Sequence, residues 1–424
     1  MFDLLKDYQN EMIYEHITYF AENIYGDVLE ERIKRRIKYE FDELNKCCNF
    51  EDIFNAAEFI DKKKCKGELL VSRLAMNNSF IFYLLGLSVV NPLPRHTYCP
   101  KCHTLHWGKL DNDICECCGH RLIEDGYDLP FAVLLDDIKR IGLKFDYSST
   151  HEYANNKLHI KFYKNDLVCL AKELGITQSQ IESNVFDKEE IIKCLDKDYY
   201  SQKYKKRYAF SNTAFMGIND LDSGIFETLH DEFKPQTFDE VTKLICMMHG
   251  TGVYDASEEN LISNFDHPDL NECICSRDEL FQFLKNNQFN DEDAVLMCRE
   301  TRINGSGHLS EFSENKLTSA LVESKYIDFM KSVSYLFHKG HVVGHIRLGF
   351  IIAKTYLEDP KRYFEAYFTI HKEMLMRIDE NDNFIKKLME TKCLELEIGY
   401  ALIIDLLERG IDAKQLICTL KARA

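Results

Sequence analysis

The sequence contains no hydrophobic run long enough to cross a membrane. Its longest apolar stretch, Phe80 to Val90, is about half of the roughly 20 residues that a membrane-spanning helix needs. The first residues, Met1 to Asp7, also lack the basic region and the apolar run of an export signal. We therefore expect a chain that is neither secreted nor inserted into a membrane and that resides in the cytoplasm.

The chain also lacks the positive charge that is typical of proteins holding duplex DNA. Its net charge is −17, so its overall field repels phosphate and any contact with nucleic acid must be local. Two basic patches could supply such a contact, or could simply be solvated surface. The first comprises Arg32, Lys34, Arg35, Arg36 and Lys38 on a predicted helix; the second comprises Lys203, Lys205, Lys206 and Arg207, interleaved with Tyr199, Tyr200, Tyr204 and Tyr208.

Internal repeats and low-complexity segments are absent as well. With 424 residues and 45% hydrophobic content, the chain can bury the cores of two or three compact domains. Sixteen cysteines without an export signal favour free thiols and a metal site over a disulfide framework, because cytosolic redox buffers keep thiols reduced.

The hydrophobic pattern predicts a mainly helical α+β fold. Apolar residues recur at three- and four-residue spacing over 7–25 and 29–44, and Asn49 is placed to cap a third helix. Strict alternation over 143–147 and 158–162 predicts two half-buried strands, the only convincing sheet signal. Capping boxes at Thr237 and Ser276 begin two later helices, two long helices follow over 326–367 with a break near Asp359, and a last amphipathic stretch covers 384–409.

The strongest chemical signal is a pair of cysteine knuckles. Cys99 and Cys102 enclose two residues, and after twelve more residues Cys115 and Cys118 repeat the arrangement. Four thiolates suit tetrahedral Zn²⁺, and closed coordination leaves no position for water, so we expect a structural zinc site. The alternative is a surface loop of free cysteines. Lesser candidates for a ligand position are Cys117, His103, His106 and His120.

The residues around the knuckles carry a family resemblance. The string from Asn91 to His96 leads into the first knuckle, and Asp125 to Pro130 follows the second. These strings resemble the zinc-bearing segment of the C-type (PolC-type) bacterial DNA polymerase III alpha subunit. Further strings resemble this family in the same order: 24–27 before the motif, and 234–238, 249–251, 275–278, 337–341 and 363–368 after it.

The resemblance implies a remnant of polymerase palm and fingers with a small inserted zinc ribbon, and it implies that much of the full polymerase is absent. It divides the chain into a helical palm-adjacent region with a degenerate nucleotide loop (1–88), the zinc-binding segment (89–130), a residual palm-like β region with helices (131–210), a fingers-like helical domain (211–375) and C-terminal helices (376–424).

At the positions that match the family's catalytic carboxylates, this sequence does not have the expected acidic residues. Asp136 and Asp137 are adjacent, so on a strand they would point to opposite faces and could not jointly grip a metal. Where the family has a third aspartate, this chain has His159, and we expect it to share an electropositive strand face with Lys157 and Lys161. The resemblance therefore implies that Mg²⁺ has no anchor, and Mg²⁺ is expected only if the chain is active.

The family's nucleotide loop is also altered. Ser72, Arg73 and Ser79 survive, but bulkier residues stand where glycines would let the backbone approach phosphates. In the fingers-like part, Lys339 and His341 match residues that face the incoming nucleotide, whereas His345 departs from the pattern. These five matching residues are a vestigial phosphate-binding set, or else ordinary surface and helix-end residues.

We therefore expect a PolC-like protein that has lost the catalytic carboxylates and binds DNA or a replication protein, supporting or interfering with the replication of a mobile element. One alternative is a minimal or split DNA-directed DNA polymerase that uses Asp136, Asp137 and Asp146. The other is a zinc-stabilised protein-interaction scaffold that never touches DNA.

Overall fold

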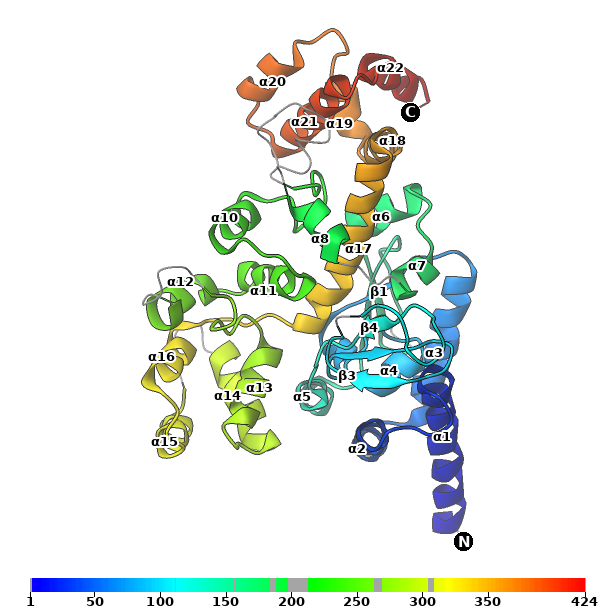
Figure 1. The fold of residues 1–424 in the computed structure, drawn as a ribbon, viewed down its shortest axis with the longest axis vertical. Helices are drawn as coiled ribbons and strands as arrows, with labels where there is room; N and C mark the ends of the chain where they lie inside the picture. The colour runs from blue at the N-terminus through cyan, green and yellow to red at the C-terminus, as the bar shows by residue number, and fades with distance from the viewer. Residues whose placement is uncertain are drawn as a thin grey trace.

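The computed structural model describes residues 2–110, 112–155, 158–183, 188–196, 213–262, 269–303 and 309–423. These residues form a mainly helical protein with two small sheets (Figure 1). Within this described part, none of the helices combines the length and the apolar character that a membrane crossing requires. The mainly helical α+β fold predicted from the sequence is confirmed at this level.

Three helices begin the chain: α1 (Phe2–Tyr25), α2 (Glu31–Cys47) and α3 (Phe50–Cys65). The apolar residues of α2 lie on one face and are buried, as their spacing predicts. Asn49 caps α3 by accepting a hydrogen bond from the backbone N–H of Glu51. The predicted helices and the predicted cap are therefore confirmed.

The chain also forms a four-stranded sheet, which contacts α3 through Phe59 and Phe162. It consists of β1 (Val71–Ser72), β5 (Phe145–Ser149), β7 (Ile160–Lys164) and β6 (Ala154–Asn155), in the order β1-β5-β7-β6. The two strands predicted from alternation are β5 and β7, which pair in parallel and bury Phe145, Tyr147, Ile160 and Phe162. A 3-10 turn, η1 (Leu74–Asn78), and a short helix, α4 (Phe80–Leu84), follow β1.

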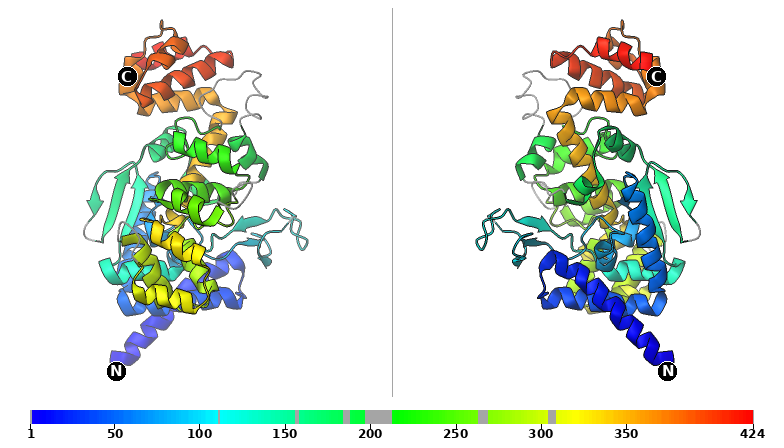
Figure 2. Two further views of the ribbon diagram at one scale, coloured as in Figure 1. Left: turned by 90° about the vertical axis from the view of Figure 1, so that its left-hand side faces the viewer. Right: turned by 90° about the vertical axis from the view of Figure 1, so that its right-hand side faces the viewer.

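The cysteine segment folds into a second sheet that the alternation pattern does not predict. Its strands β2 (His96–Tyr98), β3 (Leu105–Trp107) and β4 (Ile123–Asp125) pair antiparallel in the order β3-β2-β4. Each strand has only three residues, too few for a period of two to be visible in the sequence. This ribbon, residues 96–125, projects from the side of the molecule (Figure 2).

Helices form most of the remaining chain. They are α5 (Phe131–Ile141), α6 (Asp166–Glu173), α7 (Gln178–Ser183), α8 (Lys188–Leu195), α10 (Gly224–Phe233), α11 (Phe238–His249), α12 (Val253–Ser257) continued by η2 (Glu258–Ile262), α13 (Arg277–Asn286), α14 (Asp291–Ile303), α15 (Glu311–Ser319), α16 (Ser324–Ser332), α17 (Lys339–Glu358), α18 (Pro360–Ile370), α19 (Lys372–Arg377), α20 (Phe384–Glu390), α21 (Leu394–Glu408) and α22 (Ala413–Arg423).

Helix α17 crosses the middle of the molecule and is buried at every residue from Gly340 to Ala353 (Figure 1). It reaches the sheet through close backbone contacts. A Cβ atom at Gly340 would lie 2.8 Å from the Cβ of Asn77, and one at Gly344 would lie 3.1 Å from a methyl group of Val71. The two glycines therefore let α17 pack directly on β1 and η1.

Two of the predicted helices are wrong in length. The stretch before Asp359 is broken into α16 and α17, because residues 333–338 are extended and pair with other backbone: Tyr335 bridges to Thr251 and Phe337 to Ser276. The C-terminal stretch is likewise broken between α20 and α21. The break at Asp359 is confirmed, since its side chain caps α18 at the N–H of Arg362.

The two predicted capping boxes differ in the structure. At Thr237 both halves are present, with Glu240 returning a hydrogen bond to the backbone N–H of the cap. Ser276 accepts from the N–H of Glu279, but the Glu279 carboxylate bonds to the N–H of Cys275 instead of that of Ser276. The helix begins where the sequence predicts, with half of the predicted box.

Glu40 is a buried carboxylate that joins α2 to α4. Its side chain has no solvent exposure and accepts hydrogen bonds from the hydroxyl of Ser79 (2.7 Å), the N–H of Phe80 (2.9 Å) and the N–H of Ile81 (3.0 Å), while Arg36 pairs with it. It thus satisfies the first N–H groups of α4 from a neighbouring helix.

Replacing Glu40 with alanine should lower the free energy of unfolding by about 3–5 kcal/mol, because Arg36 and the donors of α4 lose their buried acceptor. Urea denaturation followed by circular dichroism measures this change. Glu31→Ala is the matched control: Glu31 pairs with Arg35 in the same helix but is exposed, so its loss should cost less than about 1 kcal/mol. Equal effects of the two substitutions would contradict the role of Glu40.

Candidate functional site

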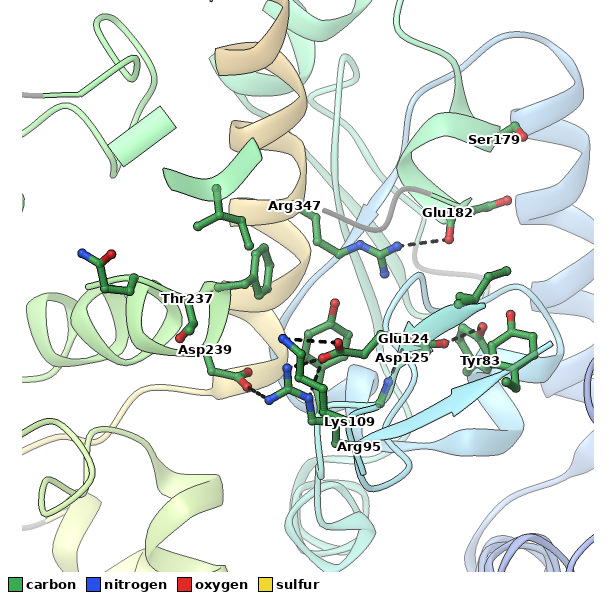
Figure 3. A pocket seen from close by; sticks show the side chains of 17 residues that line it. Tyr83, Arg95, Lys109, Glu124, Asp125, Ser179, Glu182, Thr237, Asp239 and Arg347 are labelled. Atoms are coloured by element: carbon green, nitrogen blue, oxygen red, sulfur yellow. Dashed lines mark hydrogen bonds and ion pairs between the residues drawn. The ribbon is translucent and has the colours of Figure 1, made fainter. Parts of the chain in front are cut away.

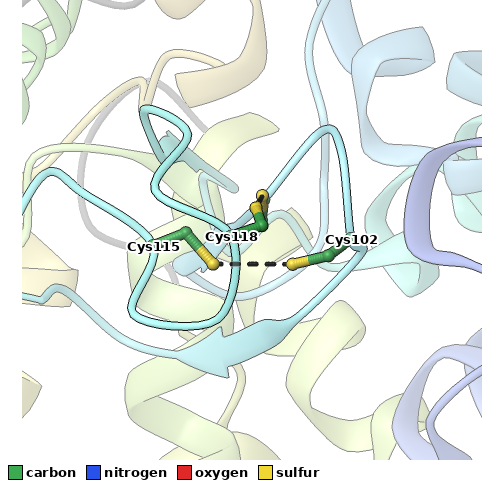
Figure 4. A group of neighbouring side chains, drawn as sticks. Cys102, Cys115 and Cys118 are labelled. Carbon is green, nitrogen blue, oxygen red and sulfur yellow. Dashed lines mark hydrogen bonds between the residues drawn. The ribbon is translucent and has the colours of Figure 1, made fainter.

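The four cysteines of the predicted metal site converge in the ribbon (Figure 4). Their sulfur atoms all lie within 4.8 Å of one another, with 3.3 Å between Cys99 and Cys118 and 3.5 Å between Cys102 and Cys115. Among the described residues, this is the only group of three or more potential ligands that converges so closely. The cluster can therefore hold a metal ion.

Each knuckle is a tight turn closed by backbone hydrogen bonds. His103 N–H donates to the carbonyl of Cys99, and Gly119 N–H donates to that of Cys115. Both donors have positive φ angles, +57° at His103 and +71° at Gly119, so the turn needs a left-handed residue at each position. Hydrogen bonds from Thr104 lower the pKa of Cys102 to about 5, whereas the pKa of Cys118 is raised to about 12, because a hydrogen bond from the His120 backbone, which lowers it, is outweighed by the neighbouring Cys99 thiol and by burial. Metal binding therefore has to displace a proton from the cluster.

The lesser ligand candidates lie outside the cluster. Cys117 and His106 are exposed, and the Nδ1 atom of His103 lies 2.9 Å from the carbonyl of Ile24 in α1. His120 is exposed at the end of the second knuckle. The donor set is thus four thiolates, which fits a tetrahedral, closed metal site.

A cavity of about 220 Å³ lies between the loop that follows β1 and helix α17. Its polar lining includes Arg73 from the loop, His341 and His345 from α17, and Asp220 with His249 from the helical part; we call this the histidine cavity. The His341 and His345 rings are 4.7 Å apart, and His249 pairs with Asp220 at 3.4 Å. Arg73 presents a buried Nε atom without a hydrogen-bond partner in the described part of the chain.

Burial keeps the two α17 histidines neutral. It lowers the pKa of His345 to about 4 and that of His341 well below its usual value; the charge of Arg73 acts in the same direction on both, whereas Asp220 opposes the shift at His345. The Nδ1 atom of His341 accepts a hydrogen bond from the N–H of Leu74 at 3.3 Å. In the neutral ring the proton is then on Nε2, so His341 is a hydrogen-bond donor at that atom.

The structure brings together only two of the five predicted phosphate-binding residues. Arg73 and His341 meet in the histidine cavity, and the backbone next to Arg73 contacts His341. Ser72 is buried and hydrogen-bonds Asn77, while Ser79 caps α4 and bonds Glu40. Lys339, the first residue of α17, donates its backbone N–H to Asp278 and is not part of the cavity lining.

Three lining residues, His345, His249 and Asp220, are not among the predicted phosphate-binding residues. His341 and His345 are four residues apart on one helix, a spacing that places them on the same face. That spacing is the signal that the sequence offers for His345. Asp220 precedes α10 and His249 ends α11, so only the packing of the helices brings them to α17.

Asp136 and Asp137 lie on helix α5, which corrects the assumption of a strand. Arg140 of the same helix bonds both carboxylates, at 3.1 Å and 2.6 Å. Arg277 of α13 reaches both at 3.6 Å and 3.5 Å, and Arg299 of α14 pairs with Asp136. The two carboxylates are therefore held by three guanidinium groups that join α5 to α13 and α14.

Asp146, the third carboxylate considered, has a different environment. It lies in β5 beside Lys161 of β7, and its backbone carbonyl accepts the N–H of Arg73 at 3.0 Å. Burial raises the pKa of Asp146, while the charges of Lys161 and Arg73 lower it. Its neighbours are thus cationic.

The predicted electropositive strand face is wrong in its geometry. His159 has a φ angle of +52° and precedes β7, which begins at Ile160. Lys157 lies outside the described residues. Of the two described residues, Lys161 occupies the strand and His159 does not. The left-handed turn at His159 ends the regular alternation one residue before the strand begins.

The first basic patch is partly neutralised. Arg36 is used inside the fold, where it bonds the carbonyls of Asn78 and Leu129. Arg35 pairs with Glu31 and Lys38 with Asp42, while Arg32 lies 4.6 Å from the ring of Trp107. Lys34 is exposed. The second patch, with Lys203, Lys205, Lys206 and Arg207, lies outside the described residues.

The cysteine cluster predicts a bound metal ion that one thiolate substitution releases. Purified protein should contain about one zinc ion per chain, and Cys99→Ser should reduce this to near zero, because three thiolates no longer close the site. Metal analysis by mass spectrometry measures the ratio. Cys117→Ser, which changes the exposed cysteine outside the cluster, should retain the ion. Full retention by Cys99→Ser would refute the assignment.

The histidine cavity predicts acid-sensitive stability. Between pH 6.5 and about 4 the unfolded chain binds protons at His341 and His345 that the folded chain does not, so the free energy of unfolding falls as the pH falls through this window. The His345 contribution, up to about 3 kcal/mol, is complete above pH 6.5. Urea titrations at several pH values should show a weaker pH dependence for His345→Gln. The exposed His16→Gln control should match the unaltered chain.

The known proteins that are similar to this chain include several with the same name. The proteins named DNA polymerase III PolC-type from Thermotoga petrophila, Thermotoga maritima and Staphylococcus saprophyticus are 22%, 23% and 22% identical to this chain, over 82%, 82% and 85% of its length. The chain spans about a third of the length of these relatives: 34%, 34% and 33%. No family model matches it. The resemblance predicted from the motifs is confirmed: this chain is a distant relative of PolC-type DNA polymerase III.

Proposed function

We propose that this chain is a PolC-like protein that does not transfer nucleotides and instead binds DNA or a replication protein, with a structural zinc ion in its ribbon. The observation that carries the proposal is the engagement of Asp136 and Asp137 by Arg140, Arg277 and Arg299. Nucleotide transfer by two metal ions needs clustered carboxylates that are free to hold Mg²⁺.

Releasing those carboxylates for a metal would be costly. Arg277 is 1% exposed and has both aspartates within 3.6 Å. A buried guanidinium that loses its anion is destabilised by about 3–5 kcal/mol, and a divalent cation placed beside it would add repulsion. The arginines therefore oppose a metal at this position.

Asp146, the remaining candidate carboxylate, does not replace Asp136 and Asp137 as a metal ligand. Asp146 has Lys161 and Arg73 as neighbours, whose charges disfavour a cation. Over the described ranges, no acidic group of three or more potential ligands converges as the cysteines do. Together these contacts support a chain that retains the polymerase-like scaffold without its reaction.

Zinc fits the cysteine cluster better than other common ions. Four sulfur donors in two knuckles favour Zn²⁺ over Mg²⁺ or Ca²⁺, which prefer oxygen. When bound, the ion supplies cross-links between the two knuckles. The chain's own backbone turns at His103 and Gly119 preorient the thiolates.

A phosphate contact, if the chain binds DNA, would use the histidine cavity. Arg73 carries a permanent charge, and His341 offers a ring donor. With a net charge of −17 the rest of the surface repels phosphates, so few ionic contacts should form. Affinity for DNA should therefore fall only shallowly as salt increases.

Primer extension tests the proposal. Purified chain, primer-template DNA, all four deoxynucleotides and Mg²⁺ or Mn²⁺ should yield no extended product, while a PolC-type polymerase run in parallel extends the primer. Extension that disappears with Asp136→Asn or Asp146→Asn would overturn the proposal in favour of a minimal polymerase, because those substitutions remove candidate metal ligands while nearly conserving side-chain size.

Fluorescence anisotropy with labelled single-stranded and duplex DNA distinguishes a DNA-binding protein from a scaffold that binds only proteins. Binding to DNA that weakens with salt, and that Arg73→Ala reduces, supports the DNA-binding role. Lys372→Ala, at an exposed position of α19, is the matched control for loss of one surface charge. No DNA binding at low salt would leave the zinc-stabilised scaffold as the better description.

A further inference from the structure

A second cavity, of about 480 Å³, lies where the ribbon meets the helical part of the chain (Figure 3). Its lining comes from β2 and β4 of the ribbon, from α4, α7 and α8, from the first turn of α11, and from α17. We call it the ribbon cavity. Its volume is in the range of about 300–1,000 Å³ that is usual for small-molecule sites.

Aromatic side chains form much of the wall. Tyr83, Tyr98, Tyr127 and Phe238 line the cavity from four different segments, and the Tyr127 and Phe238 rings lie 6.0 Å apart. Burial raises the pKa of Tyr98 and Tyr127 to about 12, so their hydroxyl groups keep their protons at neutral pH. The wall therefore offers flat apolar faces with hydrogen-bonding edges.

Charged groups at the rim neutralise one another. Arg95 pairs with Glu124 of the ribbon and with Asp239 of α11, and Lys109 lies 4.0 Å from Glu124 (Figure 3). The lining carboxylates, Glu124, Asp125, Glu182 and Asp239, outnumber the cations Arg95, Lys109 and Arg347. This balance disfavours a phosphate or another anion as the ligand.

The lining also contains a fixed donor on α17 and a fixed acceptor on β4. Arg347 is held on α17 by the carbonyls of Val89 (2.9 Å) and Glu182 (3.1 Å). Asp125 is held by Asn91 (2.8 Å) and Tyr83 (3.4 Å) at Oδ2 and by the N–H of Gly126 (2.8 Å) at Oδ1, where a further lone pair remains. A neutral ligand with both acceptor and donor atoms on its edge can use both groups.

We propose that the ribbon cavity binds an uncharged planar heterocycle of the nucleobase type. Aromatic walls stack on flat rings of any base, and the edge of a nucleobase carries the carbonyl and amino groups that Arg347 and Asp125 complement. Two sources share this chemistry: a free nucleoside and an unpaired base of a single strand. The site goes beyond the proposed function, since it requires neither catalysis nor the histidine cavity.

Calorimetric titration with each of the four deoxynucleosides tests the site directly. At least one should bind with a saturable heat, and Phe238→Ala should weaken that binding about tenfold through the loss of one stacking face. Gln236→Trp places a large side chain at an exposed position of the lining and should block binding without removing a wall residue. Lys372→Trp, at an exposed site on α19, is the matched control and should bind like the unaltered chain.

The outcomes distinguish a free nucleoside from a single strand as the source of the base, and they test the ribbon cavity independently of the proposed function. An eight-residue deoxyoligonucleotide that binds at least tenfold more tightly than the nucleoside, and that loses this advantage in Gln236→Trp, identifies a strand as the source; equal affinities identify the free nucleoside. No saturable binding by correctly folded protein at millimolar nucleoside, or binding unchanged by both Phe238→Ala and Gln236→Trp, would overturn the site. Primer extension is measured separately, so its result does not affect this one.

Discussion

The burial of helix α17 is the constraint on which the other parts of the structure depend. Its glycines bring it into contact with β1 and η1, and its polar residues reach both cavities: His341 and His345 the histidine cavity, Arg347 the ribbon cavity. A buried polar side chain must find partners inside the protein. The segments that supply those partners, at Leu74, Val89 and Glu182, are therefore fixed by the same helix.

Two pairs of carboxylates are compensated inside the fold in different ways. Glu40 and Asp278 accept hydrogen bonds from backbone N–H groups and act as caps inside the fold. Asp136 and Asp137 are paired with arginines that join three helices. In both cases the negative charge is compensated by the protein itself.

Much of the fold follows from local chemistry in the sequence. The helices α1 to α3, the caps at Asn49 and Thr237, and the strands β5 and β7 are predictable because periodicity and capping are local properties. The spacing of the cysteines likewise predicts the convergence of four sulfur atoms in the ribbon. Short-range patterns are sufficient for these features.

The errors arise where distant segments decide the conformation. Residues 333–338 match a helical pattern but pair with backbone from 251 and 276, and no local signal announces those partners. Two of the three arginines around Asp136 come from positions 277 and 299, more than a hundred residues away in the chain, and only Arg140 is a local partner. Both cavities are likewise made by packing, so the sequence indicates individual residues such as Arg73 without their neighbours.

The buried carboxylate of Asp278 has a mechanical consequence. It accepts the side-chain amide of Asn78 at 2.6 Å and the N–H of Lys339 at 2.8 Å, and thereby fastens the loop after β1 to the start of the central helix. Any hinge between these two segments would have to expose that carboxylate and break both bonds at once. The walls that these two segments give to the histidine cavity are accordingly held in place by the protein's own hydrogen bonds.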